Sequence, residues 1–228
     1  MENRSRAKSR FPFITQAASS FVSSNCAKLE AVARVSTRII AADFFRRDPI
    51  TCARELIGAQ LIWEKCAGKI VETEAYLEHD DEACHTFSRP SARAFIQRNQ
   101  PGAAYIYFSY GAHWMLNVLV KGKTNGFVLF RAVEPLRGIE LMKKRRKIDN
   151  EHGLCSGPGK LTQAFGITNR AHEMNLCVDP RHCLACGEDD VDLVADERIG
   201  ITRSAHHLWR FTERGSKFVS RPVKPFVA

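Results

Sequence analysis

The sequence lacks an apolar run long enough to cross a bilayer, and it lacks the hydrophobic core of a signal peptide. We therefore expect an intracellular protein with no membrane partner. Acidic residues are also scarce, because 25 Asp and Glu stand against 34 Lys and Arg and leave a formal net charge of +9. A charge of this sign favours a polyanionic partner, with nucleic acid ahead of an acidic membrane surface.

Cysteine pairs with the spacing of metal ligands are nearly absent. Eight cysteines scattered over 228 residues are typical of reduced thiols in an intracellular chain. One cluster, Cys177, His182, Cys183 and Cys186, contains a Cys-x-x-Cys step that could form half of a zinc site. A second pair is missing and residues 183–186 also fit a short apolar strand, so we expect no metal and no cofactor.

The first part of the chain has little hydrophobic periodicity. Residues 1–28 contain six serines and five basic residues, with Glu2 as the only acid. This composition predicts a disordered basic tail over residues 1–36 and one globular domain over residues 37–228. The tail could be a DNA-tracking arm or an organellar targeting peptide, but a dispensable extension is the simpler interpretation.

The domain shows a succession of short strands with few helices. Asp48 and Pro49 predict an N-cap and a first helical position for a helix over residues 50–57. Residues 59–65 and 69–77 predict a β-hairpin with its turn at residues 66–68. Further strands are expected at residues 104–109, 113–120, 127–133, 190–195, 198–202 and 208–211, and further helices at residues 135–147 and 161–165. The polar stretch at residues 85–100 carries no expected element.

These elements predict an α+β protein, a single compact domain on a curved antiparallel β-sheet with peripheral helices. Within the sheet, residues 70–76 form an unusual strand, because alternate side chains share one face and Glu72, Glu74 and Tyr76 therefore point the same way. Two acids beside an aromatic ring suggest a site. The alternative is a half-exposed strand with solvated glutamates.

Several other polar and aromatic residues extend this pattern. A pocket lined by them would suit a flat base extruded from a stack, with an acid beside the sugar. The alternative is that the tyrosines are ordinary strand aromatics. The residues are Glu74, Tyr76, His85, Tyr107, Tyr110, Asn117, Arg131 and Lys160.

Taken in order, the motifs of this chain resemble those of the alkyladenine (3-methyladenine) DNA glycosylase family. The resemblance covers roughly residues 37–222, and it implies a compact mixed domain on a curved antiparallel sheet, with no metal and no covalent DNA intermediate. The motifs are Ile70-Val71-Glu72-Thr73-Glu74-Ala75-Tyr76, Asp81-Glu82-Ala83-Cys84-His85, Tyr105-Ile106-Tyr107-Phe108-Ser109-Tyr110-Gly111, Asn117, Leu129-Phe130-Arg131-Ala132-Val133-Glu134-Pro135-Leu136 and Leu154-Cys155-Ser156-Gly157-Pro158-Gly159-Lys160.

The resemblance assigns the chemistry to Glu74 and Arg131. Glu74 would be the general base that activates water for attack on the anomeric carbon, and its charge would stabilise the oxocarbenium-like sugar. Arg131 would help to hold the catalytic water and the adjacent phosphate. We expect Glu72 to matter less than Glu74.

The resemblance assigns substrate and DNA contacts to further positions. Tyr76, His85 and Tyr107 would sandwich the flipped base, while Asn117 would obstruct the 2-amino group of normal guanine. Tyr110 would be the wedge left in the duplex. Three other residues would contact DNA, and these are Arg93, Leu129 and Lys160.

We therefore expect a monofunctional DNA glycosylase of base excision repair. It would hydrolyse the N-glycosidic bond of alkylated or deaminated purines (3-methyladenine, 7-methylguanine, hypoxanthine, ethenoadenine) in double-stranded DNA, as a monomer, by base flipping. It would act in the cytoplasm of a bacterium, or in the nucleus or an organelle of a eukaryote.

Two alternatives from the residues stay open. A metal-dependent nuclease could draw carboxylates from Glu72, Glu74, Asp80, Asp81 and Glu82. A non-catalytic nucleic-acid-binding module would also explain the net charge and the aromatic strand.

Overall fold

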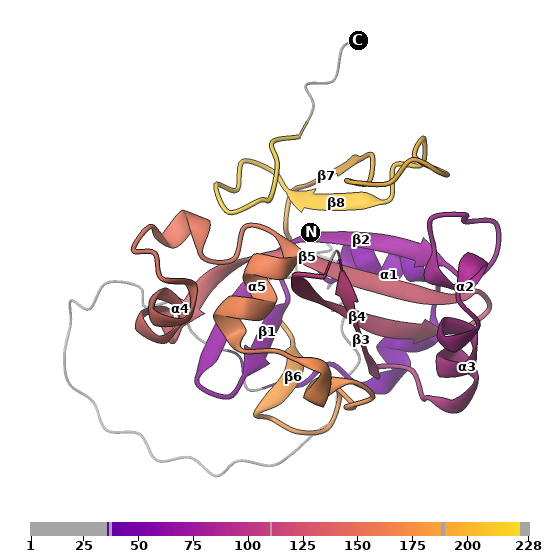
Figure 1. Cartoon of the computed structure of the whole chain (residues 1–228), viewed down its shortest axis with the longest axis horizontal. Coiled ribbons are helices and arrows are strands. Elements are labelled where there is room, and N and C mark those ends of the chain that lie inside the picture. The colour runs from indigo at the N-terminus through magenta and orange to yellow at the C-terminus, as the bar shows by residue number, and fades with distance from the viewer. Residues whose placement is uncertain (1–35, 37, 110, 188–189, 224–228) are drawn as a thin grey trace, which may run out of the picture.

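The computed structural model describes residues 36, 38–109, 111–187 and 190–223 (Figure 1). The expected tail, apart from residue 36, and the expected wedge Tyr110 lie outside these residues. No helix among the described residues is long and apolar enough to span a membrane.

One antiparallel sheet organises the molecule. Its main path runs β3-β4-β5-β2-β1-β6, while β8 pairs with β2, and β7 pairs with β8. The strands are β1 (Gln60–Trp63), β2 (Cys66–Leu77), β3 (Ala104–Ser109), β4 (His113–Lys121), β5 (Asn125–Arg137), β6 (His182–Ala185), β7 (Leu193–Asp196) and β8 (Arg210–Glu213).

The helices surround the sheet, with α2 and α3 at one end and α4 at the other (Figure 1). They are α1 (Pro49–Glu55), α2 (His85–Ser88), α3 (Pro90–Arg98), α4 (Ile139–Arg146) and α5 (Pro158–Phe165), with 3-10 turns at Ala42–Arg46, Glu151–Gly153 and Asn169–Ala171. The expected α+β class, with one compact domain on a curved antiparallel sheet, is confirmed.

The long strand β2 lies between two sets of neighbours. One edge pairs with β5 over most of its length, and the other pairs with β1 at residues 66–69 and with β8 at residues 72–74. Irregular register between β2 and β5 occurs on both sides of Glu72. Such bulges bend a strand and increase its twist. Glu72 and Glu74 therefore lie just past the point where the partner of this second edge changes from β1 to β8. At both residues β2 is paired on its two edges, with β5 on one side and β8 on the other.

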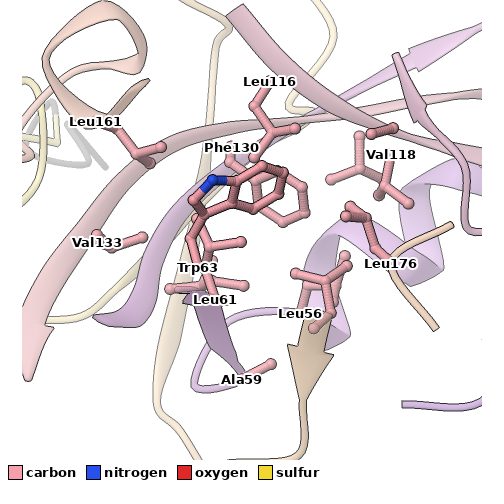
Figure 2. Packing of buried hydrophobic residues seen from close by; sticks show 14 of the residues in the cluster. Leu56, Ala59, Leu61, Trp63, Leu116, Val118, Phe130, Val133, Leu161 and Leu176 are labelled. Carbon is pink, nitrogen blue, oxygen red and sulfur yellow. The ribbon is translucent and has the colours of Figure 1, made fainter. Parts of the chain in front are cut away.

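The main core fills the face of the sheet opposite these glutamates. Asp48 caps α1 by accepting a hydrogen bond from Thr51 N at 2.8 Å, and Pro49 occupies the first helical position, as predicted. The Thr73 hydroxyl of β2 donates to the Ala53 carbonyl of α1 at 2.8 Å. Figure 2 shows the packing around Trp63 and the neighbouring strands. Thr73 of β2 thus faces the core, while its neighbours Glu72 and Glu74 lie on the opposite face of the sheet.

Two predicted boundaries near α4 are wrong. The hairpin turn lies at Glu64, whose φ is 52°, and β2 begins at Cys66, so residues 66–68 are not the turn. Strand β5 passes through Pro135, where a helix was expected to begin. A register shift opposite Ala67 and Gly68 accommodates the proline, which has no N–H for the ladder. Helix α4 begins only after Gly138, whose φ is 79°.

Two further expectations are wrong. Residues 198–202 form a loop, and the polar stretch at 85–100 folds into α2 and α3. Helix α3 buries Ala92, Phe95 and Ile96, which recur at i, i+3 and i+4. That spacing is the signal of an amphipathic helix, and it is visible in the sequence beneath the polar composition.

Candidate active site

A cavity of about 520 Å³ opens over the face of the sheet that carries the glutamates. Strands β3 to β5, the beginning of α2 and the loop after β7 form its walls. The residues that line it are Tyr76, Ala83, Cys84, His85, Arg89, Tyr105, Tyr107, Phe108, Ser109, Met115, Asn117, Phe127, Leu129, Arg131, Pro158, Ile199, Gly200 and Ile201. The structure therefore brings together six of the predicted site residues, namely Tyr76, His85, Tyr107, Asn117, Leu129 and Arg131.

A row across four strands explains why these side chains meet. Glu74 of β2 lies opposite Leu129 of β5, which lies opposite Asn117 of β4, which in turn lies opposite Tyr105 of β3. Directly opposed residues of antiparallel strands present their side chains on the same face. The row thus sets the spacing between the acid at one end and the aromatic wall at the other.

Glu74 is fully buried beneath the cavity. Its Oε2 accepts hydrogen bonds from the Tyr76 hydroxyl at 2.8 Å and from Arg131 Nη1 at 3.2 Å. Its Oε1 accepts from the Ile199 backbone N–H at 2.7 Å. Glu74 itself does not line the cavity, but all three of its donors belong to lining residues. Three hydrogen-bond donors thus converge on this one carboxyl group.

Arg131 provides the positive charge of the site. Its guanidinium lies between Glu74 and Glu72, with Nε 3.0 Å from Glu72 Oε1. Burial alone would lower the pKa of Arg131, but the charges of Glu74 and Glu72 outweigh burial and raise the pKa above its ordinary value. Arg131 is therefore a permanent cation at the cavity wall.

The aromatic wall is electrically neutral near pH 7. Tyr107 and His85 meet edge to face with ring centroids 4.2 Å apart, and Tyr105 Oη lies 3.1 Å from His85 Nδ1. Burial, followed by the charge of Arg89, lowers the pKa of His85 from 6.5 to about 4. Burial, followed by the charge of Glu74, raises the pKa of Tyr76. The wall therefore presents flat, uncharged surfaces suited to stacking.

The sequence analysis missed Arg198, which supports this wall from behind. Its guanidinium forms two hydrogen bonds to Asp81, at 2.7 and 2.8 Å, and its Cζ lies 4.6 Å from the Tyr76 ring centroid and 4.9 Å from that of Trp209. The pair ties the loop before His85 to the loop that carries Ile199. A buried acid requires a compensating partner, so Asp81 needs a cation once it is buried. The sequence does not show which cation that is.

The predicted residues that remain fall in different places. Leu129, expected as a DNA contact, is 4% exposed within the cavity wall. Arg93 donates to the Thr86 carbonyl and so links α3 to α2. Lys160 is exposed in the first turn of α5, with Nζ 3.5 Å from Ser156 Oγ. Asn117 lines the cavity, but its Nδ2 also donates to the Tyr105 carbonyl at 3.1 Å, a bond that by itself would explain a buried amide at this position.

Within the described part of the chain, four of the five carboxylates suggested for a metal, all but Asp80, form ion pairs with arginines. Glu72 bonds to Arg131 and Arg210, and Asp81 bonds to Arg198. Among the described residues, no group of three or more His, Cys, Asp or Glu is arranged to hold a metal ion. Cys183 lies in the short strand β6, as one of the two interpretations predicted.

Comparison with known proteins gives a consistent result. Residues 43–217 match the family model described as methylpurine-DNA glycosylase. A protein of Nitrosospira multiformis, provisionally named a 3-methyladenine DNA glycosylase, is 44% identical over 181 residues, which cover 79% of this chain and 93% of that protein. Proteins of the same provisional name from Rhodopseudomonas palustris (43% over 182 residues, 79% of this chain and 90% of the relative) and Salinibacter ruber (40% over 204 residues, 82% and 98%) are also similar.

Proposed function

The chain belongs to the methylpurine-DNA glycosylase family, and from this membership we propose that it flips a damaged purine into its cavity and hydrolyses the glycosidic bond with water activated by Glu74. The membership confirms the resemblance drawn from the sequence and the expected enzyme class. The protein is a DNA glycosylase, a hydrolase of the N-glycosidic bonds of methylated purines, and DNA is its substrate.

The observation that carries the proposed mechanism is the buried Glu74 beneath an aromatic cavity. The volume of about 520 Å³ lies within the range of pockets that enclose small ligands. A flipped purine would stack against Tyr76, His85 and Tyr107, and its sugar would lie towards Arg131 and Glu74. This arrangement would set a negative charge beside the anomeric carbon, where positive charge develops as the bond breaks.

The proposed reaction needs one water molecule and one base. As the purine departs with the bonding electrons, the water oxygen attacks the anomeric carbon and Glu74 takes the water proton. Tyr76 and Arg131, which bond to Glu74, both line the cavity. A water molecule at this wall would replace one of these two bonds and would then bond both to Glu74 and to the residue that it displaced. The products are the free base and an abasic site.

The neutral wall has a consequence for lesion preference. Purines alkylated at N3 or N7 are cationic and leave as neutral bases, so Glu74 alone is sufficient for them. Hypoxanthine and ethenoadenine are neutral and need a proton on the departing base. His85 is neutral near pH 7, and the Tyr76 hydroxyl already donates to Glu74. We expect cationic lesions to be released faster than neutral ones.

The partner and compartment follow from the same proposal. The substrate is double-stranded DNA that contains a damaged purine, and the protein acts on it as a monomer. The named relatives are bacterial, which supports the cytoplasm as the compartment. Lys160 and Arg93 are proposed as DNA contacts, while Leu129 is reassigned to the pocket.

The decisive experiment measures base release from duplexes that carry 7-methylguanine, hypoxanthine or ethenoadenine, in the presence of EDTA. Release of free base with an intact strand supports the glycosylase mechanism. Strand cleavage that EDTA abolishes would support the metal-dependent nuclease. Tight binding to every lesion duplex without base release would support the non-catalytic module.

A further inference from the structure

Glu72, the other carboxylate of β2, lies in a buried charge cluster that the proposed chemistry does not use. It is 0% exposed, and its Oε1 accepts hydrogen bonds from Arg131 Nε at 3.0 Å and from Arg210 Nε at 2.8 Å. A carboxylate that is shared by two guanidinium groups is held more rigidly than one in a single ion pair. Glu72 was expected to matter less than Glu74, and this geometry gives it a role of its own beside Glu74.

Each guanidinium nitrogen of Arg131 bonds to a different residue. Nε donates to Glu72 at 3.0 Å, Nη1 to Glu74 at 3.2 Å and Nη2 to Ser220 Oγ at 3.4 Å. Because the guanidinium is planar, fixing two of its nitrogens fixes the third. Glu72 and Ser220 therefore determine where Nη1 meets the proposed base.

The segment that follows β8 completes the cluster. The Ser220 hydroxyl donates to Glu72 Oε1 at 2.8 Å, and the Ser220 backbone N–H donates to Glu72 Oε2 at 2.5 Å. Arg210 donates from Nη2 to the Arg221 carbonyl and from Nη1 to Asp196 Oδ2 at 3.0 Å. The Glu72 carboxylate of β2 is thus contacted from β5, from β8 and from the segment after β8. Only the Arg131 side chain separates this carboxylate from Glu74.

We propose that Glu72 and Ser220 are positioning residues that hold Arg131 against Glu74, so that the segment after β8 is part of the active site. The inference rests on the proposed function of Glu74 and deepens it. Neither residue touches the substrate. Their effect is to keep the Arg131 guanidinium within the small tolerance that a catalytic base and its water require, since small displacements of such groups reduce rates strongly.

A purely structural role would have a different signature. If the cluster only neutralised buried charge, its disruption would unfold part of the sample and leave the remaining molecules fully active. A positioning role predicts the reverse, with every molecule folded and each one slower. Single-turnover kinetics with enzyme in excess separate the two, because the amplitude reports the active fraction and the rate constant reports the chemical step.

The experiment compares Ser220→Ala with Ser220→Thr on a 7-methylguanine duplex. Ser220 is half-buried, so both variants are suited to fold, and threonine keeps the hydroxyl that alanine removes. We expect Ser220→Ala to lower the single-turnover rate constant by about tenfold, with full amplitude and with a lesion-duplex Kd within about twofold of the wild type. Ser220→Thr should restore most of the rate.

Glu213→Gln is the matched control. Glu213 joins β8 to β2 through Lys69 at 2.8 Å, yet within the described part of the chain it forms no hydrogen bond or ion pair with Arg131 or Glu72. It should change the melting temperature without changing the rate constant. Glu72→Gln removes more of the cluster than Ser220→Ala does, and it is used if its melting curve shows a folded protein. Its single-turnover rate constant should fall by roughly 10²-fold.

Two results would overturn the inference while leaving the proposed function in place. One is a Ser220→Ala rate constant within about twofold of the wild type at full amplitude, since loss of a hydrogen bond that orients a catalytic group should be visible. The other is a loss seen only in amplitude. A wild-type protein that releases no base from any lesion duplex would instead overturn the proposed function itself.

Discussion

A glutamine in place of Glu74 would keep the shape of the side chain and remove its charge. Arg131 would retain its bond to Glu72, so the substitution would not leave a buried cation without a partner. We expect Glu74→Gln to fold, to bind a lesion duplex with near wild-type affinity and to lose base release by roughly 10² to 10⁴-fold. Single-turnover release and a binding titration measure the two quantities. Release within about tenfold of the wild type would assign the base to another residue.

Asn117 combines a structural bond with a place in the cavity wall. It is 3% exposed, and its Nδ2 is committed to the Tyr105 carbonyl, so its orientation is fixed. We expect Asn117→Ser to raise the release of unmodified guanine relative to hypoxanthine, because a smaller side chain leaves room for the 2-amino group. The lost hydrogen bond should also lower stability by about 1 kcal/mol.

The measurement for Asn117 is the ratio of guanine to hypoxanthine release on matched duplexes. A ratio that rises supports the steric role. If both rates fall together and the ratio does not change, Asn117 is a framework residue whose bond to Tyr105 is its whole contribution.

His85 predicts an acid sensitivity of the folded state. Its pKa is lowered from 6.5 to about 4 by burial and then by Arg89, so the folded protein resists protonation that the unfolded chain accepts. Stability is therefore fully present above pH 6.5 and declines as the pH falls towards 4. At about 1.4 kcal/mol per pKa unit, the loss is at most roughly 3.5 kcal/mol.

Chemical denaturation at pH 7 and pH 4 tests the contribution of His85. The difference in unfolding free energy between the two pH values should shrink in His85→Gln relative to the wild type. His79→Gln, at an exposed position, is the control and should leave the difference unchanged. Equal acid losses in the wild type and His85→Gln would contradict the assignment.

At the scale of elements, hydrophobic alternation was sufficient to predict β2 to β5 and therefore the face that carries Glu74 and Tyr76. It could not predict that β5 continues through Pro135, because the bulge opposite Gly68 that accommodates the proline depends on tertiary pairing. Helix α3 was missed for a different reason. Its three buried residues have the apolar spacing of an amphipathic helix, but polar residues outnumber them, and the polar composition was given more weight than the spacing.

The site, like the fold, was predictable from the sequence only in part. Tyr107 and Asn117, which lie on strands, were assigned to the pocket by the family motifs, and both line the cavity. The supports from distant segments were not, because Arg198 and Ser220 lie 117 and 148 residues from their carboxylate partners. Contacts of this separation leave no periodic signal in the sequence, and only the fold shows which donor meets which acid.

At the scale of the whole molecule, the basic residues fall into two groups, those buried inside the protein and those exposed on its surface. Arg131, Arg198 and Arg210 are buried and bonded to carboxylates, so they add little to the field outside the protein. The formal charge of +9 must therefore be expressed mainly by exposed side chains. Binding to a lesion duplex should weaken steeply with salt, because exposed cations displace counterions from phosphates.

The affinity of Glu74→Gln for a lesion duplex, measured between roughly 50 and 200 mM salt, tests this distribution without interference from turnover. We expect a straight plot of log affinity against log salt, with a negative slope that becomes shallower by about one unit in the additional variant Lys160→Ala. Lys143→Ala is the matched control, since Lys143 carries the same charge but is paired with Glu140 at 2.9 Å and Glu151 at 3.4 Å. A flat plot would argue against a phosphate footprint. Equal slopes for the two lysine variants would place the footprint elsewhere on the surface, because Lys160 then contributes no more than a lysine already neutralised by its own acids.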